Sequence, residues 1–234
     1  MKTQYAVLAS LCCVAATSSQ ASLVSSLDTG AGQYPNNLVA HAPLTDPNWT
    51  VSLLSTVPAN QTPPGNLTGK AYLVPNDIGF PIPPWLANSL TSTWITYSQP
   101  TQVNGDNTGG TYQYQTSFSA DQSGTIGINY ASDNNGYLYI NGTQYSDNGS
   151  SESTFEQWTT YNLSVTAGHV YTVDLDVYNQ PQGNGNPTGA NVQFTGTGVD
   201  VTPVPEASTV LAGALMLLPF GVSTLRIMRR RKMA

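Results

Sequence analysis

Two aspartates are the clearest place for acid–base chemistry in this chain of 234 residues. Asp174 and Asp176 are two positions apart in an alternating segment, so both should project from the same, outer face of a strand, about 7 Å apart. Glycoside hydrolases use a pair of carboxylates, and Glu152 and Glu156 are further candidates for such a pair. The spacing of Asp174 and Asp176 suits an inverting enzyme. A solvated acidic edge that discourages strand pairing explains the same pattern, and we predict that arrangement.

Nucleophilic catalysis has little support in the sequence. His41 and His169 are the only histidines, and no serine lies in a Gly-x-Ser-x-Gly elbow. His169 follows Gly168 at the start of a predicted strand, where a structural, exposed histidine is the ordinary case. The sequence therefore predicts a protein that is not an enzyme.

Oxygen ligands for a hard cation occur in two loops. Asp133 and Asn135 belong to an Asp-Asn-Asn-Gly run, and Asp147 begins an Asp-Asn-Gly run. The two runs flank residues 138–140 and could converge above them, as calcium ligands on flexible loops do. Ordinary turn chemistry explains the same residues. A structural calcium ion is the one cofactor that the sequence suggests.

Three tyrosines are candidates for contact with a ligand. If Leu138 and Ile140 point inward, Tyr137 and Tyr139 must point outward, and Tyr178 ends its strand on the face opposite Val177. Exposed aromatic rings stack on sugar rings, and their hydroxyl groups serve as hydrogen-bond partners. The alternative is that these tyrosines pack under loops.

The elements that must position these residues are predicted to be strands. Between residues 110 and 195 apolar residues recur at every second position, and turn signals separate the segments. Asn141-Gly142 is the dipeptide best suited to a type I′ hairpin. Short alternating strands with such spacing predict an all-β fold, an antiparallel β-sandwich, with no amphipathic helix before the C-terminal tail. The residues expected to point inward include Tyr112, Tyr114, Phe118, Ile126, Ile128, Tyr130, Leu138, Ile140, Leu163, Val165, Val173, Leu175, Val177, Val192 and Phe194.

Charge excludes several partners for the central region, residues 22–203. It contains one lysine, Lys70, no arginine and twelve acidic residues, so its formal net charge is −11. Such a surface repels phosphate backbones and excludes nucleic acid. Its abundant uncharged polar residues suit hydrated polysaccharide. Both cysteines, Cys12 and Cys13, precede this region, so it has no disulfide or thiolate site.

The N-terminus has the pattern of a secretory signal peptide. Lys2 precedes an apolar stretch, residues 5–16, and Ser19-Gln20-Ala21 supplies the small residues that a signal peptidase requires. We expect cleavage after Ala21, with Ala16 as the alternative.

The C-terminus combines a short motif, an apolar run and a basic cluster. Residues 210–225 would rise about 24 Å as a helix, short of a bilayer core of roughly 30 Å. The basic cluster should remain cytoplasmic, which leaves the preceding chain outside the inner membrane. An ordinary tail anchor is the alternative. The residues of the motif and the cluster are Val204, Pro205, Glu206, Ala207, Arg229, Arg230 and Arg231.

This tripartite tail resembles the PEP-CTERM sorting signal, although Ala207 departs from the Pro-Glu-Pro consensus. The resemblance implies recognition by an exosortase, a membrane-embedded cysteine transpeptidase-like enzyme, after export by a Gram-negative bacterium that makes exopolysaccharide. It also implies release from the inner membrane to the cell surface or extracellular matrix. An unprocessed chain would stay membrane-anchored.

A series of segments between residues 46 and 198 is similar to the β-sandwich common in PEP-CTERM proteins. It implies a jelly-roll fold similar to galactose-binding-like and protective-antigen-type carbohydrate modules. The segments are 46–51 (DPNWTV), 92–95 (STWI), 110–116 (GTYQYQT), 131–134 (ASDN), 138–142 (LYING) and 186–190 (NPTGA).

These inferences define the organisation and function that we expect. The segments are a signal peptide (1–21), an N-terminal extension (22–45), the β-sandwich (46–200), a linker with the sorting motif (201–209), a hydrophobic helix (210–225) and a basic tail (226–234). The expected function is that of a non-catalytic surface or matrix protein associated with exopolysaccharide and biofilm. The alternatives are a lectin-like carbohydrate-binding module and a secreted glycosidase.

Overall fold

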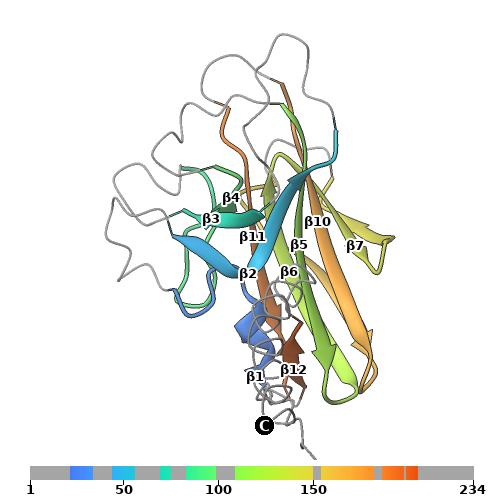
Figure 1. Ribbon diagram of the computed structural model, residues 1–234. Helices are drawn as coiled ribbons and strands as arrows, with labels where there is room; N and C mark the ends of the chain where they lie inside the picture. The colour runs from blue at the N-terminus through green and yellow to red at the C-terminus, as the bar shows by residue number, and fades with distance from the viewer. Residues whose placement is uncertain are drawn as a thin grey trace, which may run out of the picture.

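A jelly-roll-like antiparallel β-sandwich is the architecture of the chain, as predicted (Figure 1). The computed structural model describes residues 22–33, 44–55, 69–74, 83–98, 109–149, 154–181, 186–197 and 199–204. Within these ranges the one helix is a 3-10 turn, η1 (Val24–Leu27). The strands are β1 (Ser22–Leu23), β2 (Thr45–Leu53), β3 (Gly69–Leu73), β4 (Ile95–Thr96), β5 (Gly110–Ala120), β6 (Gly124–Asp133), β7 (Asn135–Ile140), β8 (Thr143–Asp147), β9 (Thr159–Val165), β10 (Val170–Asn179), β11 (Gly189–Thr195) and β12 (Asp200–Pro203).

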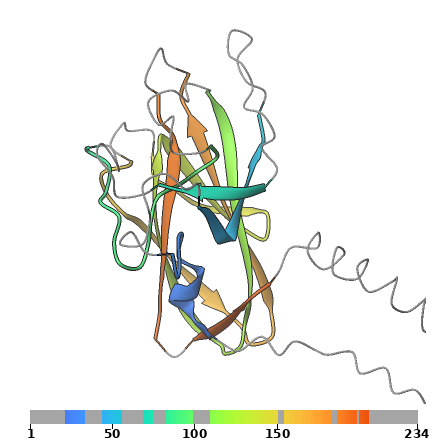
Figure 2. The same cartoon turned by 60° about the vertical axis from the view of Figure 1, so that its left-hand side comes forward.

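One continuous path of hydrogen-bonded strands builds both layers of the sandwich. The order is β8-β7-β10-β5-β2-β3-β4-β11-β6-β9, and β12 joins β5 to β1 beside this path. The path doubles back at β3 and β4, so the β8-β7-β10-β5-β2 layer faces the β11-β6-β9 layer (Figures 1 and 2). Contacts of β6 with β7 and β10 cross the space between the layers.

Successive strands mostly alternate between the layers. β5 pairs with β10 and β2, whereas β6, which follows it directly, pairs with β11 and β9. β2, β3 and β4 are exceptions, because they pair in chain order. β7 and β8 are another exception, because they form a hairpin within one layer. Its turn residues Asn141 and Gly142 have φ of 51° and 77°, which confirms the predicted type I′ turn.

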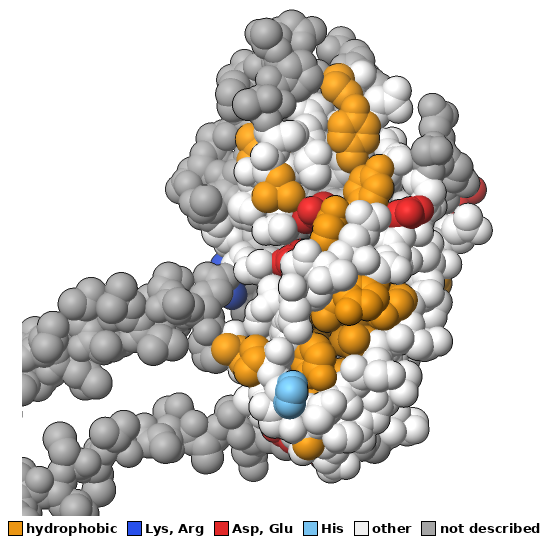
Figure 3. All heavy atoms as spheres, turned by 90° about the vertical axis from the view of Figure 1, so that its right-hand side faces the viewer, with side chains coloured by type: hydrophobic (Ala, Val, Ile, Leu, Met, Phe, Trp, Pro, Cys, Tyr) orange, Lys and Arg blue, Asp and Glu red, His pale blue; other side chains and the backbone are white. Residues whose placement is uncertain are grey.

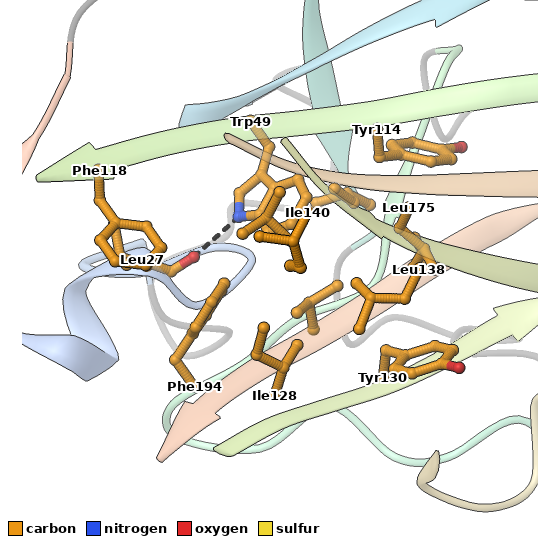
Figure 4. Packing of buried hydrophobic residues seen from close by; sticks show 14 of the residues in the cluster. Leu27, Trp49, Tyr114, Phe118, Ile128, Tyr130, Leu138, Ile140, Leu175 and Phe194 are labelled. Carbon is orange, nitrogen blue, oxygen red and sulfur yellow. Dashed lines mark hydrogen bonds between the residues drawn. The ribbon is translucent and has the colours of Figure 1, made fainter. Parts of the chain in front are cut away.

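The core fills the space between the layers (Figure 4). β5 alternates strictly between buried and partly exposed residues, and Tyr112, Tyr114 and Phe118 are fully buried. The inward faces predicted for β10 and β11 are confirmed by the burial of their apolar side chains. Trp158 is partly buried against a second, smaller cluster.

The N-terminal segment, residues 22–33, is part of this core. Leu27 is fully buried, and its carbonyl oxygen accepts a 2.8 Å hydrogen bond from Trp49 Nε1 (Figure 4). The backbone N–H of Thr29 donates to the carbonyl of Val192 on β11 at 3.0 Å. The segment predicted as an extension therefore closes one end of the sandwich.

The loop of residues 83–94 covers part of the outer face of the β11-β6-β9 layer. The rings of Trp85 and Trp94 lie with their centroids 4.3 Å apart and their planes tilted by 32°, and they pack against Ala131 of β6. Gly189 of β11 lies beneath both rings, where a Cβ atom would come within 3.4 Å of each. This part of the outer face is therefore covered by the chain itself.

The described residues contain no helix long and apolar enough to cross a bilayer. The predicted signal peptide, the hydrophobic segment 210–225 and the basic tail lie outside the described residues.

Candidate functional site

The outer face of the other layer carries the three tyrosines and two aspartates that the sequence singled out. On β7, Tyr137 and Tyr139 alternate with buried Leu138 and Ile140, so their outward orientation is confirmed. We name this surface the tyrosine–aspartate face. Its residues are Gln113, Gln115, Tyr137, Tyr139, Asp174 and Asp176.

Strand register arranges these six residues in two matching rows. In one row Tyr137 lies opposite Asp176, which lies opposite Gln113. In the next row the corresponding residues are Tyr139, Asp174 and Gln115. Neighbouring strands are about 4.8 Å apart and the rows about 7 Å apart, so the face repeats the same aromatic, carboxylate and amide groups twice.

Both rows continue onto the strands on either side. On β8, Asp147 lies opposite Tyr137 and Gln144 lies opposite Tyr139. On β2, Ser52 and Thr50 lie opposite Gln113 and Gln115. Each row thus has a hydrogen-bonding side chain at both ends.

The two aspartates are not the solvated acidic edge that we predicted. β10 pairs with β5 on one side and β7 on the other, so it is an interior strand. Asp174 and Asp176 are only 7% and 9% exposed, because the longer side chains of the neighbouring strands surround them. That prediction was wrong because alternation shows which face a residue occupies but not whether its strand lies at an edge.

Each carboxylate is held by the glutamine beside it. Gln115 Nε2 donates to Asp174 Oδ1 at 2.7 Å, and Gln113 Nε2 donates to Asp176 Oδ1 at 3.1 Å. The other oxygen of each, Oδ2, receives no hydrogen bond from any residue that the structure describes. The face therefore retains two carboxylate oxygens that are free to accept hydrogen bonds from a ligand.

Burial also alters the acidity of the pair. Burial raises the pKa of Asp176 to about 6, against the opposing effect of the Gln113 hydrogen bond, and repulsion from Asp174 adds to the rise. Burial raises the pKa of Asp174 as well, again partly opposed by its glutamine. A cation between the two carboxylates would remove much of this cost.

Tyr178 extends the face toward the end of β10. Tyr178 is 39% exposed, whereas the neighbouring Val177 is fully buried, as predicted. It lies opposite Asn135 of β7. Figure 3 shows acidic side chains beside hydrophobic and aromatic ones on the side of the molecule where β7 and β10 lie. The structure thus places the three predicted tyrosines on one solvent-facing surface.

The two loops proposed to hold calcium do converge, through protein hydrogen bonds. Asn148 Oδ1 accepts from the backbone N–H of Gly136 at 2.6 Å, and Asn148 Nδ2 donates to Ser132 Oγ at 2.7 Å. Asp133 Oδ2 accepts from Trp85 Nε1, and Asp147 Oδ1 accepts from the backbone N–H of Gly149. No group of three or more His, Cys, Asp or Glu residues in the described ranges is arranged to hold a metal. Calcium binding by Asp133, Asn135 and Asp147 stays a prediction.

The remaining catalytic candidates are not assembled into a site by the described residues. Glu156 and His169 are exposed, and Glu152 and His41 lie outside the described residues. Asp174 and Asp176 follow one another along a single strand and do not face each other across a cleft.

Two other buried carboxylates escaped the sequence analysis. Asp28 accepts from the backbone N–H of Phe194 at 2.6 Å, and Asp46 accepts from the backbone N–H groups of Gly30, Asn48 and Trp49. Both join the N-terminal segment to the sandwich. Phe194 and Gly30 lie 166 and 16 residues from the carboxylates that they bind, so no local pattern indicates those bonds. Asn48 and Trp49 lie only two and three residues after Asp46, a local turn that the sequence analysis did not identify.

Part of the predicted sorting motif is visible. Val204 directly follows β12 and is 39% exposed. Pro205, Glu206, Ala207 and the arginine cluster lie outside the described residues.

Comparison with known proteins adds little to this description. No protein family and no curated protein matches the chain. Among solved structures, the chain is similar to the CBM35 of Abf62 from Cellvibrio japonicus, with 15% identity, a TM-score of 0.31, and 68% of this chain and 94% of that chain covered. It is also similar to Xyl-CBM35 in complex with a glucuronic acid containing disaccharide, with 16% identity, a TM-score of 0.29, and coverage of 70% and 99%.

A third similarity is to a glucose complex of a β-glucosidase from Kluyveromyces marxianus, with 16% identity and a TM-score of 0.33. The match covers 41% of this chain and spans 12% of the length of that enzyme. The strands and their register define the fold of this chain.

Proposed function

We propose that this chain is an exported, exosortase-sorted, non-catalytic protein of the cell surface or extracellular matrix, and that it binds extracellular polysaccharide through the tyrosine–aspartate face. The observation that carries the binding proposal is the repeated row of tyrosine, aspartate and glutamine across β7, β10 and β5. Aromatic rings contribute apolar contact with sugar rings, while carboxylates and amides accept and donate hydrogen bonds to hydroxyl groups.

The position of the face supports this role. β7, β10 and β5 are each paired on both sides. Ligand groups held by such strands keep a fixed spacing, which reduces the entropy lost on binding. The opposite layer is a poorer platform, since Trp85 and Trp94 occupy part of its outer face.

A non-catalytic role fits the geometry of the acidic residues. Glycoside hydrolysis needs two carboxyl groups on opposite sides of the scissile bond. Asp174 and Asp176 point from the same side of one strand, and each is tied to a glutamine. Such a pair suits binding better than proton transfer across a sugar.

The test of the binding proposal is the double variant Tyr137→Ala/Tyr139→Ala in the full chain. Loss of two stacked rings should cost roughly 1–3 kcal/mol, about a five- to hundredfold loss of affinity. Affinity electrophoresis in gels containing exopolysaccharide from the producing bacterium should therefore show weaker retention, with an unchanged circular dichroism spectrum.

Tyr145→Ala provides the matched control. Tyr145 is 51% exposed on β8 but packs against Tyr161 of β9, away from the two rows. Its loss should leave retention unchanged. Equal migration of the wild type and the Tyr137→Ala/Tyr139→Ala variant would refute polysaccharide binding by this face and leave a structural matrix role.

A further inference from the structure

The charge of the tyrosine–aspartate face indicates which class of polysaccharide fits it, an inference that rests on the proposed function. Asp174 and Asp176 occupy the centre of the face, each with an oxygen that no described residue hydrogen-bonds. Asp147, opposite Tyr137, adds a third carboxylate at the β8 border. The ligand side of this surface is therefore negative.

No basic side chain in the described ranges lies near these carboxylates. Lys70, the single lysine or arginine of residues 22–203, lies on β3 opposite Thr50 of β2. Three strand spacings separate β3 from β10, roughly 14 Å. The ammonium group of Lys70 is also engaged, because it donates to the carbonyl of Pro47 at 2.7 Å.

We propose that the face binds a polysaccharide with free amino sugars, whose ammonium groups pair with Asp174 and Asp176 while the sugar rings lie on Tyr137 and Tyr139. An ammonium group has three donors and matches an open carboxylate oxygen. A polymer of uronic acids would place its own carboxylates against this pair and against a region of net charge −11.

Low exposure makes this pairing selective. Carboxylates that are 7% and 9% exposed interact more strongly with a cation than fully solvated ones do, because less water screens the pair. Binding of an ammonium ion would also lower the raised pKa of Asp176, so uptake of the ligand near pH 6 should release protons. A surface that attracted cations only through its net charge would show no such dependence on these two residues.

The test compares two polymers that differ in acetylation: glycol chitosan, with free amino groups, and glycol chitin, in which they are acetylated. We expect the full chain to be retained in gels containing glycol chitosan, more weakly in glycol chitin, and not at all in polygalacturonate. Asp174→Asn/Asp176→Asn should weaken retention by glycol chitosan at least about tenfold, the effect of losing one charge-assisted hydrogen bond.

The control variant removes two carboxylates elsewhere on the surface. Asp121 and Glu156 are both exposed, and Asp121→Asn/Glu156→Gln changes the net charge by the same amount. It should leave retention within about twofold, since exposed charges at a distance are screened by salt. Thermal unfolding of both variants confirms that they fold, and asparagine preserves the Oδ1 acceptor for each glutamine.

The outcomes separate this inference from the proposed function. Equal weakening by both double variants means that general charge attraction causes retention, and it overturns the amino-sugar site. Retention by glycol chitin or polygalacturonate that requires Tyr137 and Tyr139 but not the aspartates leaves polysaccharide binding intact and overturns the amino-sugar preference. Failure of every polymer, including the bacterium's own exopolysaccharide, overturns both.

Discussion

Two buried aspartates have pKa values that differ strongly between the folded and the unfolded protein. Asp28 is fully buried, its Oδ2 atom has no hydrogen-bond partner in the structure, and burial raises its pKa to about 7. Burial raises the pKa of Asp133 to about 7 as well, although its hydrogen bond from Trp85 opposes the rise. Each of these groups holds a proton in the folded state at a pH where the unfolded chain has lost it.

This difference predicts that acid stabilises the fold. Between pH 3.8 and about 7 the folded state binds more protons than the unfolded state, so the free energy of unfolding should fall as pH rises through this range. The expected loss from these two groups is about 5 kcal/mol between about pH 5 and about pH 8, because each pKa lies about 2 units above the lower pH. Urea unfolding at the two pH values measures this loss.

Two variants isolate the cause. Asp28→Asn/Asp133→Asn should reduce the dependence but not abolish it, because burial also raises the pKa of Asp176 to about 6. Asp121→Asn/Glu156→Gln, which alters exposed groups, should retain the whole dependence. Stability that rises with pH would show that these carboxyl groups are ionised in the folded protein without cost.

Among the elements, η1 shows how far the sandwich depends on its first residues. Leu27 inserts its side chain between the layers, beside Phe118 and Phe194 (Figure 4). The same residue accepts the indole hydrogen bond of Trp49. Burial of the Leu27 side chain and pairing of the buried Trp49 N–H both depend on this one turn.

Leu27→Ala should therefore lower the free energy of unfolding by about 2–5 kcal/mol, the usual cost of removing a fully buried leucine side chain. Leu90→Ala is the matched control, because Leu90 is 69% exposed and its truncation should change stability by less than about 0.5 kcal/mol. Urea unfolding of the full chain measures both. Equal stability of the two variants would mean that η1 does not contribute to the stability of the sandwich.

Strands and their inward faces could be predicted from the sequence, whereas their partners could not. A period of two is a local property, so Tyr137 and Tyr139 could be assigned outward from Leu138 and Ile140 alone. The hydrogen bond from Gln115 to Asp174 joins two residues that are 59 positions apart in the sequence, and it depends on the packing of the whole sandwich. For the same reason, the prediction of an acidic edge strand was wrong, and Gln113 and Gln115 were not recognised as part of the site.

At the scale of the whole molecule, the described residues end directly after β12, at one border of the sandwich. β12 pairs with β1 and β5, and the chain leaves it at the exposed Val204. A sorting motif that begins there would follow the folded domain directly. Cleavage at the motif would then release a complete sandwich.

Processing predicts a defined mature mass. If the tail is a sorting signal, protein extracted from the cell surface should end near residues 206–208 and lack the basic cluster of residues 226–232. Intact mass spectrometry measures this, and cells without exosortase activity should retain the longer form. A surface protein that still carries Met233 and Ala234 would instead be a membrane-anchored protein.

The most direct test of polysaccharide binding by the tyrosine–aspartate face is oxidative footprinting of tyrosines in the full chain, followed by mass spectrometry. Addition of exopolysaccharide from the producing bacterium should slow modification of Tyr137, Tyr139 and Tyr178, because a bound chain would cover their outward edges. Modification of Tyr145, which is 51% exposed outside the face, should be unchanged. Unaltered modification of all four tyrosines, or protection of Tyr145 alone, would contradict the account.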